Sequence, residues 1–135
     1  MTTLHGTCLC GGVRFEVDTT PEGIRFCHCE SCKKLSGGGS TANVRAPSGA
    51  IRIVEGEDRV QTYQPPEGSA KTFCRVCGSN LFGGGWPDSE HCSVRITTLE
   101  ESPTGLPVAH LYVRSVAAWE QLPDDGGERF ETTSR

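Results

Sequence analysis

The sequence lacks the long apolar runs, the charged leader and the basic excess that mark several classes of protein. No stretch approaches the roughly 20 apolar residues of a membrane-spanning helix, so we expect no membrane span. Residues 1–17 contain no positively charged start followed by an apolar run, and they predict no secretory signal. Acidic residues outnumber basic ones by 17 to 13, which gives no support to nucleic-acid binding. We therefore expect a cytoplasmic protein without nucleic-acid or membrane partners.

Apolar residues are also scarce, whereas glycine is frequent. Hydrophobic residues make up 35% of the 135 residues, and there are 17 glycines. The length is that of one domain, and the sequence shows no internal repeat. We predict a single domain over residues 1–123, with a small core supplemented by metal. The polar, glycine-rich residues 124–135 are expected to form a flexible tail.

Helical periodicity is nearly absent from the chain. No segment carries three clean helical turns, and the best short candidates are residues 30–35 and 115–119. Apolar and polar residues instead alternate over residues 13–17, 51–53 and 92–96, a period typical of strands with one buried face. Glycine and proline clusters between these segments predict turns. The pattern favours an all-β domain of short antiparallel strands with metal-binding turns at the strand ends.

The chain contains eight cysteines, and seven of them are clustered. Neighbouring cysteines close almost no loop as a disulfide, and cytosolic thiols stay reduced. Short spacings bring several thiols toward one metal ion, so the clusters predict metal sites. The clusters are Cys8 with Cys10, then Cys27, Cys29 and Cys32, and then Cys74 with Cys77, whereas Cys92 stands alone.

The pair Cys74 and Cys77, followed by Gly78, has the spacing of a zinc knuckle. The glycine permits the positive φ angle that often closes such a turn. Structural zinc takes four ligands, so this pair is half of a site. Cys8 and Cys10 are the natural partners, but the spacing alone leaves Cys27 and Cys29 as an alternative.

The remaining three cysteines, Cys27, Cys29 and Cys32, form an incomplete tetrahedron. A zinc ion with three protein ligands keeps a position for water or substrate, so we expect an open, reactive site there. The alternative is that His28, Cys92 or another group supplies a fourth ligand and the site is inert. Cys92 shares a strand face with apolar residues, and we interpret it as a small buried hydrophobic residue.

Four motifs together resemble one known family, the glutathione-dependent formaldehyde-activating enzymes, which also includes the domain of centromere protein V. The motifs are G-x-C-L-C-G-G-V-R-F-E-V (6–17), C-H-C-x-x-C-K-K-x-S-G (27–37), F-C-x-x-C-G-S-N-L-F (73–82) and H-L-Y-V-x-S-x-A-A-W (110–119). They occur in the family's order over most of the chain. The resemblance implies a small twisted antiparallel β-sandwich-like zinc domain with short strands and zinc knuckles.

The resemblance also implies residue roles and an activity. Two zinc ions are expected, and the three-cysteine site is expected to lose its metal more readily. The implied activity is that of a carbon–sulfur lyase acting on S-hydroxymethylglutathione, the adduct of glutathione and formaldehyde, or on the adduct of a related small thiol. The implied ligands are Cys8, Cys10, Cys74 and Cys77 for a structural zinc ion, and Cys27, Cys29 and Cys32 for a catalytic one.

Other residues near the cysteines have open roles. His28 is a candidate for proton transfer, although a residue between two ligands can equally face solvent or pack against the sheet. Lys33 and Lys34 are candidates for binding the carboxylates of glutathione, or are solvated charges. Trp119 is interpreted as a core anchor, and Trp86 as pocket wall or core.

Two further classes of function stay open at this point. One is a non-catalytic, zinc-stabilised binding module, and the other is thiol-redox or metal handling. An enzyme predicts a pocket at the three-cysteine site, whereas a binding module predicts a closed site.

Overall fold

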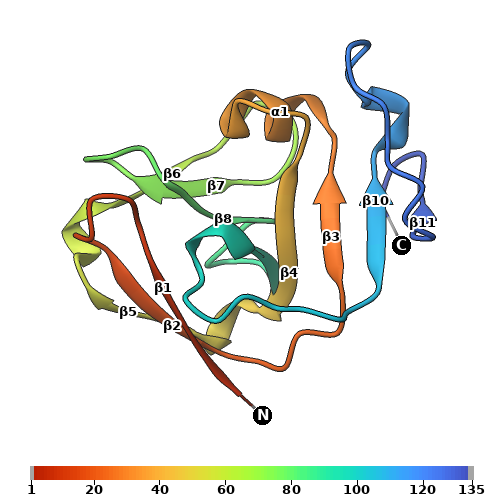
Figure 1. The fold of residues 1–135 in the computed structure, drawn as a ribbon. Coiled ribbons are helices and arrows are strands. Elements are labelled where there is room, and N and C mark those ends of the chain that lie inside the picture. Colours follow the sequence, from red (N-terminus) through yellow and green to blue (C-terminus); the bar gives the residue numbers. More distant parts are fainter. Residues whose placement is uncertain (1, 134–135) are drawn as a thin grey trace.

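The computed structural model describes residues 2–133, which form two β-sheets (Figure 1). The small sheet has the order β1 (Thr3–Thr7), β2 (Arg14–Asp18), β5 (Ile51–Glu55). The large sheet has the order β11 (Glu128–Arg129), β10 (Val108–Leu111), β3 (Ile24–Cys27), β4 (Thr41–Pro47), β9 (His91–Arg95), β8 (Asn80–Gly83), β7 (Lys71–Cys74), β6 (Val60–Tyr63). The predicted all-β class is confirmed, and the three alternating segments lie in or next to β2, β5 and β9.

The large sheet is mixed rather than wholly antiparallel. Strand β10 pairs in parallel with both β3 and β11, whereas the other named pairs are antiparallel. The expected antiparallel pairing therefore does not extend to this edge of the large sheet. A parallel neighbour is joined to its partner by a long connection, so pairing between β3 and β10 leaves no local signal in the sequence.

The apolar core lies between the two sheets. Alternating side chains of β2 and β4 point into it, and Phe15 meets Phe82 edge to face with ring centroids 4.8 Å apart. Cys92 is buried in the same core, as its place in the strand alternation predicts. The opposite face of the large sheet carries polar residues of β3, β4 and β9, among them Arg25, Asn43 and Ser93. One face of the large sheet therefore packs in the core, and the opposite, polar face is available to line a functional site.

Helical structure in the described residues is short. The helix α1 (Glu30–Ser36) lies at the ends of β3 and β4 and agrees with the predicted segment 30–35 (Figure 1). The second helical prediction, for residues 115–119, is wrong, because the turn there is a 3-10 helix over Val113–Ser115. Further 3-10 turns span Ser48–Ala50, Glu57–Arg59 and Ile96–Thr98. Within residues 2–133 no helix has the length and apolar content needed to span a bilayer.

The segment after residue 123 makes specific contacts that the sequence does not predict. Strand β11 pairs with β10, and the Phe130 amide donates to the carbonyl of His110 at 2.9 Å. The Asp125 carboxylate lies 2.7 Å from the Nε2 atom of His110. These contacts place the segment against the edge of the large sheet, and its flexibility in solution stays a prediction.

Candidate metal centres

Four cysteines from two distant segments meet at one point. Cys8 and Cys10 follow β1, whereas Cys74 ends β7 and Cys77 lies in the next turn. Their Sγ atoms all lie within 4.8 Å of one another, a spacing that suits four ligands around one metal ion. The sequence left open whether Cys27 and Cys29 complete this site, and the structure brings Cys8 and Cys10 there instead.

Two glycine turns shape this four-cysteine cluster. Gly11 and Gly78 have φ angles of 76° and 82°, and their amides donate to the carbonyls of Cys8 and Cys74 at 3.1 and 2.8 Å. Residues with a β-carbon rarely adopt this left-handed region, so glycine is the residue that permits each turn. The amide of Val13 also donates to the Cys8 Sγ at 3.2 Å, which would stabilise a thiolate there. The four converging thiols could therefore hold one metal ion.

The second cluster is made by the junction between β3 and α1. Cys27 ends β3, Cys29 is the N-cap of α1, and Cys32 lies in its first turn. The Cys29 Sγ accepts a hydrogen bond from the Cys32 amide at 3.4 Å, and the three Sγ atoms lie within 4.8 Å of one another. Hydrogen bonds with Cys27 and Cys29 lower the pKa of the Cys32 thiol, whereas hydrogen bonds with Cys29 and Cys32 raise the pKa of the Cys27 thiol. Three converging soft sulfur donors fit a zinc ion that keeps an open position.

A buried arginine that sequence reasoning missed lies against this three-cysteine cluster. Arg95, from β9, is only 4% exposed, and its guanidinium donates to the side chains of Asn80, Asn43 and Thr41. Its Nη2 atom is buried without a hydrogen-bond partner among residues 2–133. Its charge acts on all three thiols of the cluster. An arginine cannot shed its proton, so an anionic metal–thiolate cluster is the group that this charge would balance.

The cationic residues that are close to the cysteines in sequence do not share the buried position of Arg95 against the three-cysteine cluster. The Lys33 Nζ forms an ion pair with the Glu30 carboxylate at 2.7 Å, and Lys34 is exposed. Arg75 is exposed, whereas Arg25 lines the cavity described next. Alternation in β9 correctly puts Arg95 on the polar face, but only the tertiary structure makes that face a cavity.

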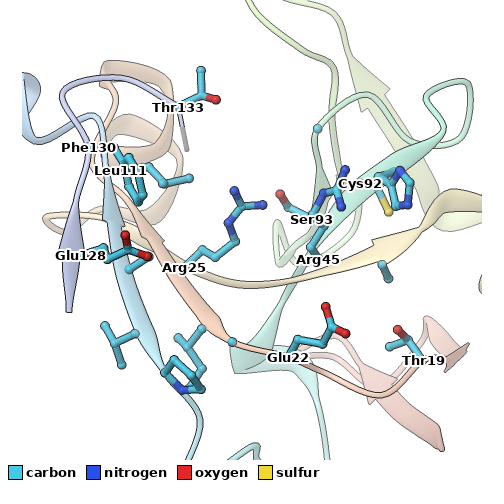
Figure 2. A pocket seen from close by; sticks show the side chains of 18 of the residues that line it. Thr19, Glu22, Arg25, Arg45, Cys92, Ser93, Leu111, Glu128, Phe130 and Thr133 are labelled. Carbon is cyan, nitrogen blue, oxygen red and sulfur yellow. The ribbon is translucent and has the colours of Figure 1, made fainter. Parts of the chain in front are cut away.

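A cavity of about 410 Å³ opens on the three-cysteine cluster. Its lining includes the three cysteines together with Arg95 and Lys71. A larger hollow of about 940 Å³ shares the lining residues Arg25, Gly84, Ser93 and Leu111 with it, so the two adjoin on the polar face of the large sheet. Figure 2 shows Arg25 in this hollow, between Leu111 on one side and Ser93 on the other. The three-cysteine cluster thus has the pocket that the enzyme hypothesis predicts.

His28 lies inside the protein and is only 2% exposed. Its Nδ1–H donates to the Gly39 carbonyl at 3.1 Å, and its Nε2 lies 3.1 Å from the Nδ1 of His110. His110 in turn contacts the Asp125 carboxylate. Burial lowers the pKa of His28. The ring therefore links the junction between β3 and α1 to β10 and the C-terminal segment, which agrees with the packing interpretation rather than with exposure to solvent.

The two tryptophans have different environments. Trp86 is half-buried, donates from Nε1 to the Ser48 carbonyl at 3.2 Å, and packs on Phe82 at the edge of the core. Trp119 is 74% exposed, so its interpretation as a core anchor is wrong. The reason is that the chain leaves β10 through a 3-10 turn rather than a helix, and no apolar face forms there to pack against the sheet.

The charge of Arg95 can be removed without removing its polarity by the substitution Arg95→Gln. We expect the three-cysteine cluster to bind zinc at least about tenfold more weakly, because a buried positive charge no longer offsets the thiolates. Zinc retention against a competing chelator measures the effect. Arg75→Gln is the matched control, since Arg75 is exposed beside the other cluster. Identical retention curves for wild type and Arg95→Gln would contradict the assigned role.

Comparison with known proteins places these features in a family. The sequence model of the glutathione-dependent formaldehyde-activating enzyme family matches residues 3–115. A putative glutathione-dependent formaldehyde-activating enzyme of Halomonas elongata is 32% identical over 96 residues, covering 65% of this chain. The chain spans only 61% of that relative's length.

The fold has a counterpart among solved structures. The crystal structure of a Rhodobacter sphaeroides protein is similar with a TM-score of 0.62 and 24% sequence identity, and covers 78% of this chain and 99% of that one. This likeness supports the fold alone. The match of the family model over residues 3–115 shows that the chain belongs to the glutathione-dependent formaldehyde-activating enzyme family.

Proposed function

We propose that the chain is a zinc-dependent carbon–sulfur lyase that acts on the adduct of formaldehyde with glutathione or a related small thiol. The names of the family and of the Halomonas relative support these substrates. The observation that carries the proposal is the cavity of about 410 Å³ that opens on three converging thiols. The proposed ligands are Cys8, Cys10, Cys74 and Cys77 for a structural zinc ion, and Cys27, Cys29 and Cys32 for a catalytic one.

The reaction is a reversible addition. In the forward direction a sulfur–carbon bond forms, the carbonyl π bond of formaldehyde breaks, and the carbonyl oxygen takes up the proton that the thiol gives up. Zinc bound at the three-cysteine cluster would supply a positive centre that favours the thiolate form of the substrate, which is the form that attacks carbon.

The residues around the cluster have supporting roles in this proposal. Arg95 offsets the negative charge of the thiolates, which would otherwise oppose the approach of another anionic sulfur. We assign His28 a positioning role rather than proton transfer, because both ring nitrogens already contact Gly39 and His110.

The exchange of ¹³C-formaldehyde with glutathione, followed by NMR, tests the proposed function. The uncatalysed reaction is already appreciable, so the exchange rate is measured rather than product formation. We expect the rate to rise in proportion to the concentration of zinc-loaded protein and to fall to the uncatalysed value with metal-free protein. No acceleration by protein that carries zinc at both clusters would reject the lyase and favour a zinc-stabilised binding module.

A further inference from the structure

The cavity at the three-cysteine cluster carries more positive than negative side chains. Four cations and two carboxylates line it, namely Arg25, Lys71, Arg95 and Arg114 against Glu30 and Glu67. Glu30 is already paired with Lys33, and Glu67 is exposed. Lys71 and Arg95 differ from the other cations because both are more than nine-tenths buried.

Lys71 has no charged partner in the described part of the chain. The residue is 7% exposed, and among residues 2–133 its Nζ donates a hydrogen bond only to the hydroxyl of Ser69, at 3.5 Å. No carboxylate of residues 2–133 lies within 4.0 Å of this ammonium group. A buried ammonium group without a counter-ion is unfavourable, because burial removes most of its hydration. Arg95 faces the cysteine thiols, so the charge of Lys71 remains available to an anion that enters from outside.

The backbone holds Lys71 in a defined place. It is the first residue of β7, which pairs with β6 through Lys71 and Tyr63 and with β8 through Thr72 and Phe82. The same strand ends at Cys74 of the four-cysteine cluster. A central strand anchored in this way fixes the position of the ammonium group more tightly than a surface loop would.

We propose that Lys71 binds a carboxylate of the thiol substrate while the substrate sulfur lies at Cys27, Cys29 and Cys32. The cavity would then select small thiols that carry a carboxylate over thiols that carry none. This inference rests on the proposed function for the position of the sulfur. It assigns the recognition of the anion to Lys71 rather than to Lys33, whose Nζ is bonded to Glu30, or to the exposed Lys34.

Binding of S-methylglutathione to the full, zinc-loaded chain tests Lys71 separately from catalysis, because this probe keeps the carboxylates and has no free thiol. Isothermal titration calorimetry gives the Kd. We expect Lys71→Met to raise the Kd by about tenfold to a hundredfold, since a charge-assisted hydrogen bond is lost. Lys71→Arg is expected to retain most of the affinity, and the exposed-lysine control Lys34→Met is expected to leave the Kd within about twofold.

A second comparison uses only the wild-type chain, so it does not depend on how a variant folds. The diethyl ester of S-methylglutathione, which has no free carboxylate, is expected to bind at least about tenfold more weakly than the acid. Equal binding of acid and ester, an unchanged Kd for Lys71→Met, or no binding of the acid at millimolar concentration would overturn the proposal. If the acid binds through Lys71 but formaldehyde exchange is not accelerated, the lyase fails and the carboxylate site stands.

Discussion

The Cys29→Ser protein is expected to purify with one zinc ion per chain instead of two, and to lose the acceleration of thiol–formaldehyde exchange. The substitution removes one of three ligands, so the remaining two thiols hold metal far more weakly. The fold is expected to survive, because the four-cysteine cluster is untouched. The helix α1 also keeps its cap, since Cys29 is its N-cap residue and serine is among the most favourable residues at that position.

Zinc content, the exchange rate and the thermal unfolding midpoint together check this prediction. Cys92→Ala is the matched control, because Cys92 is buried in the core and belongs to neither cluster. It is expected to lower the unfolding free energy by about 1–2 kcal/mol through a small cavity, while both zinc ions and the exchange rate are kept. Full activity in Cys29→Ser would show that the proposed catalytic cluster is wrong.

The second large effect is expected from Cys74→Ser, which should abolish the cooperative fold. Metal binding to structural zinc sites contributes about 10–16 kcal/mol in small zinc-binding peptides, whereas whole domains are stable by only about 5–15 kcal/mol. Cys74 is fully buried at the end of β7, and its cluster joins segments that are 64 residues apart. Loss of this site would therefore release the loop after β1 from β7 and expose the core.

Circular dichroism melting and the dispersion of amide NMR signals measure the loss of the fold. Cys10→Ser separates the metal from packing, because Cys10 belongs to the same cluster but is exposed. We expect both variants to lose the cooperative transition. If Cys10→Ser melts like wild type while Cys74→Ser does not, the effect comes from the buried side chain and the cluster is not a structural metal site.

The sequence was sufficient for features that depend on residues close together in the chain. Alternation over a few residues predicted strands at β2, β5 and β9, because side chains in a strand point to opposite faces. The short spacing Cys27, Cys29, Cys32 predicted one cluster for the same local reason. Gly78 was expected to close its turn, and it has the positive φ angle that such a turn requires.

Features that depend on the pairing of strands far apart in the chain could not be predicted from the sequence. The parallel pairing of β10 with β3, and the contact of Asp125 with His110, join segments whose own sequences carry no sign of each other. The burial of His28 follows from that pairing. Trp119 was misjudged because a large aromatic residue usually packs in a core, whereas the chain around it forms no apolar face here.

The sequence by itself therefore determined the family, the all-β class and the three short clusters of cysteines, since each is recorded in motifs a few residues long. Only the tertiary structure decided which cysteines share the four-cysteine cluster, and which charges meet the three-cysteine cluster. Arg95 and Lys71 look like ordinary polar-face residues in their strands. They become a buried pair of cations because β9 and β7 place them around one cavity, and that placement depends on contacts between strands far apart in the chain.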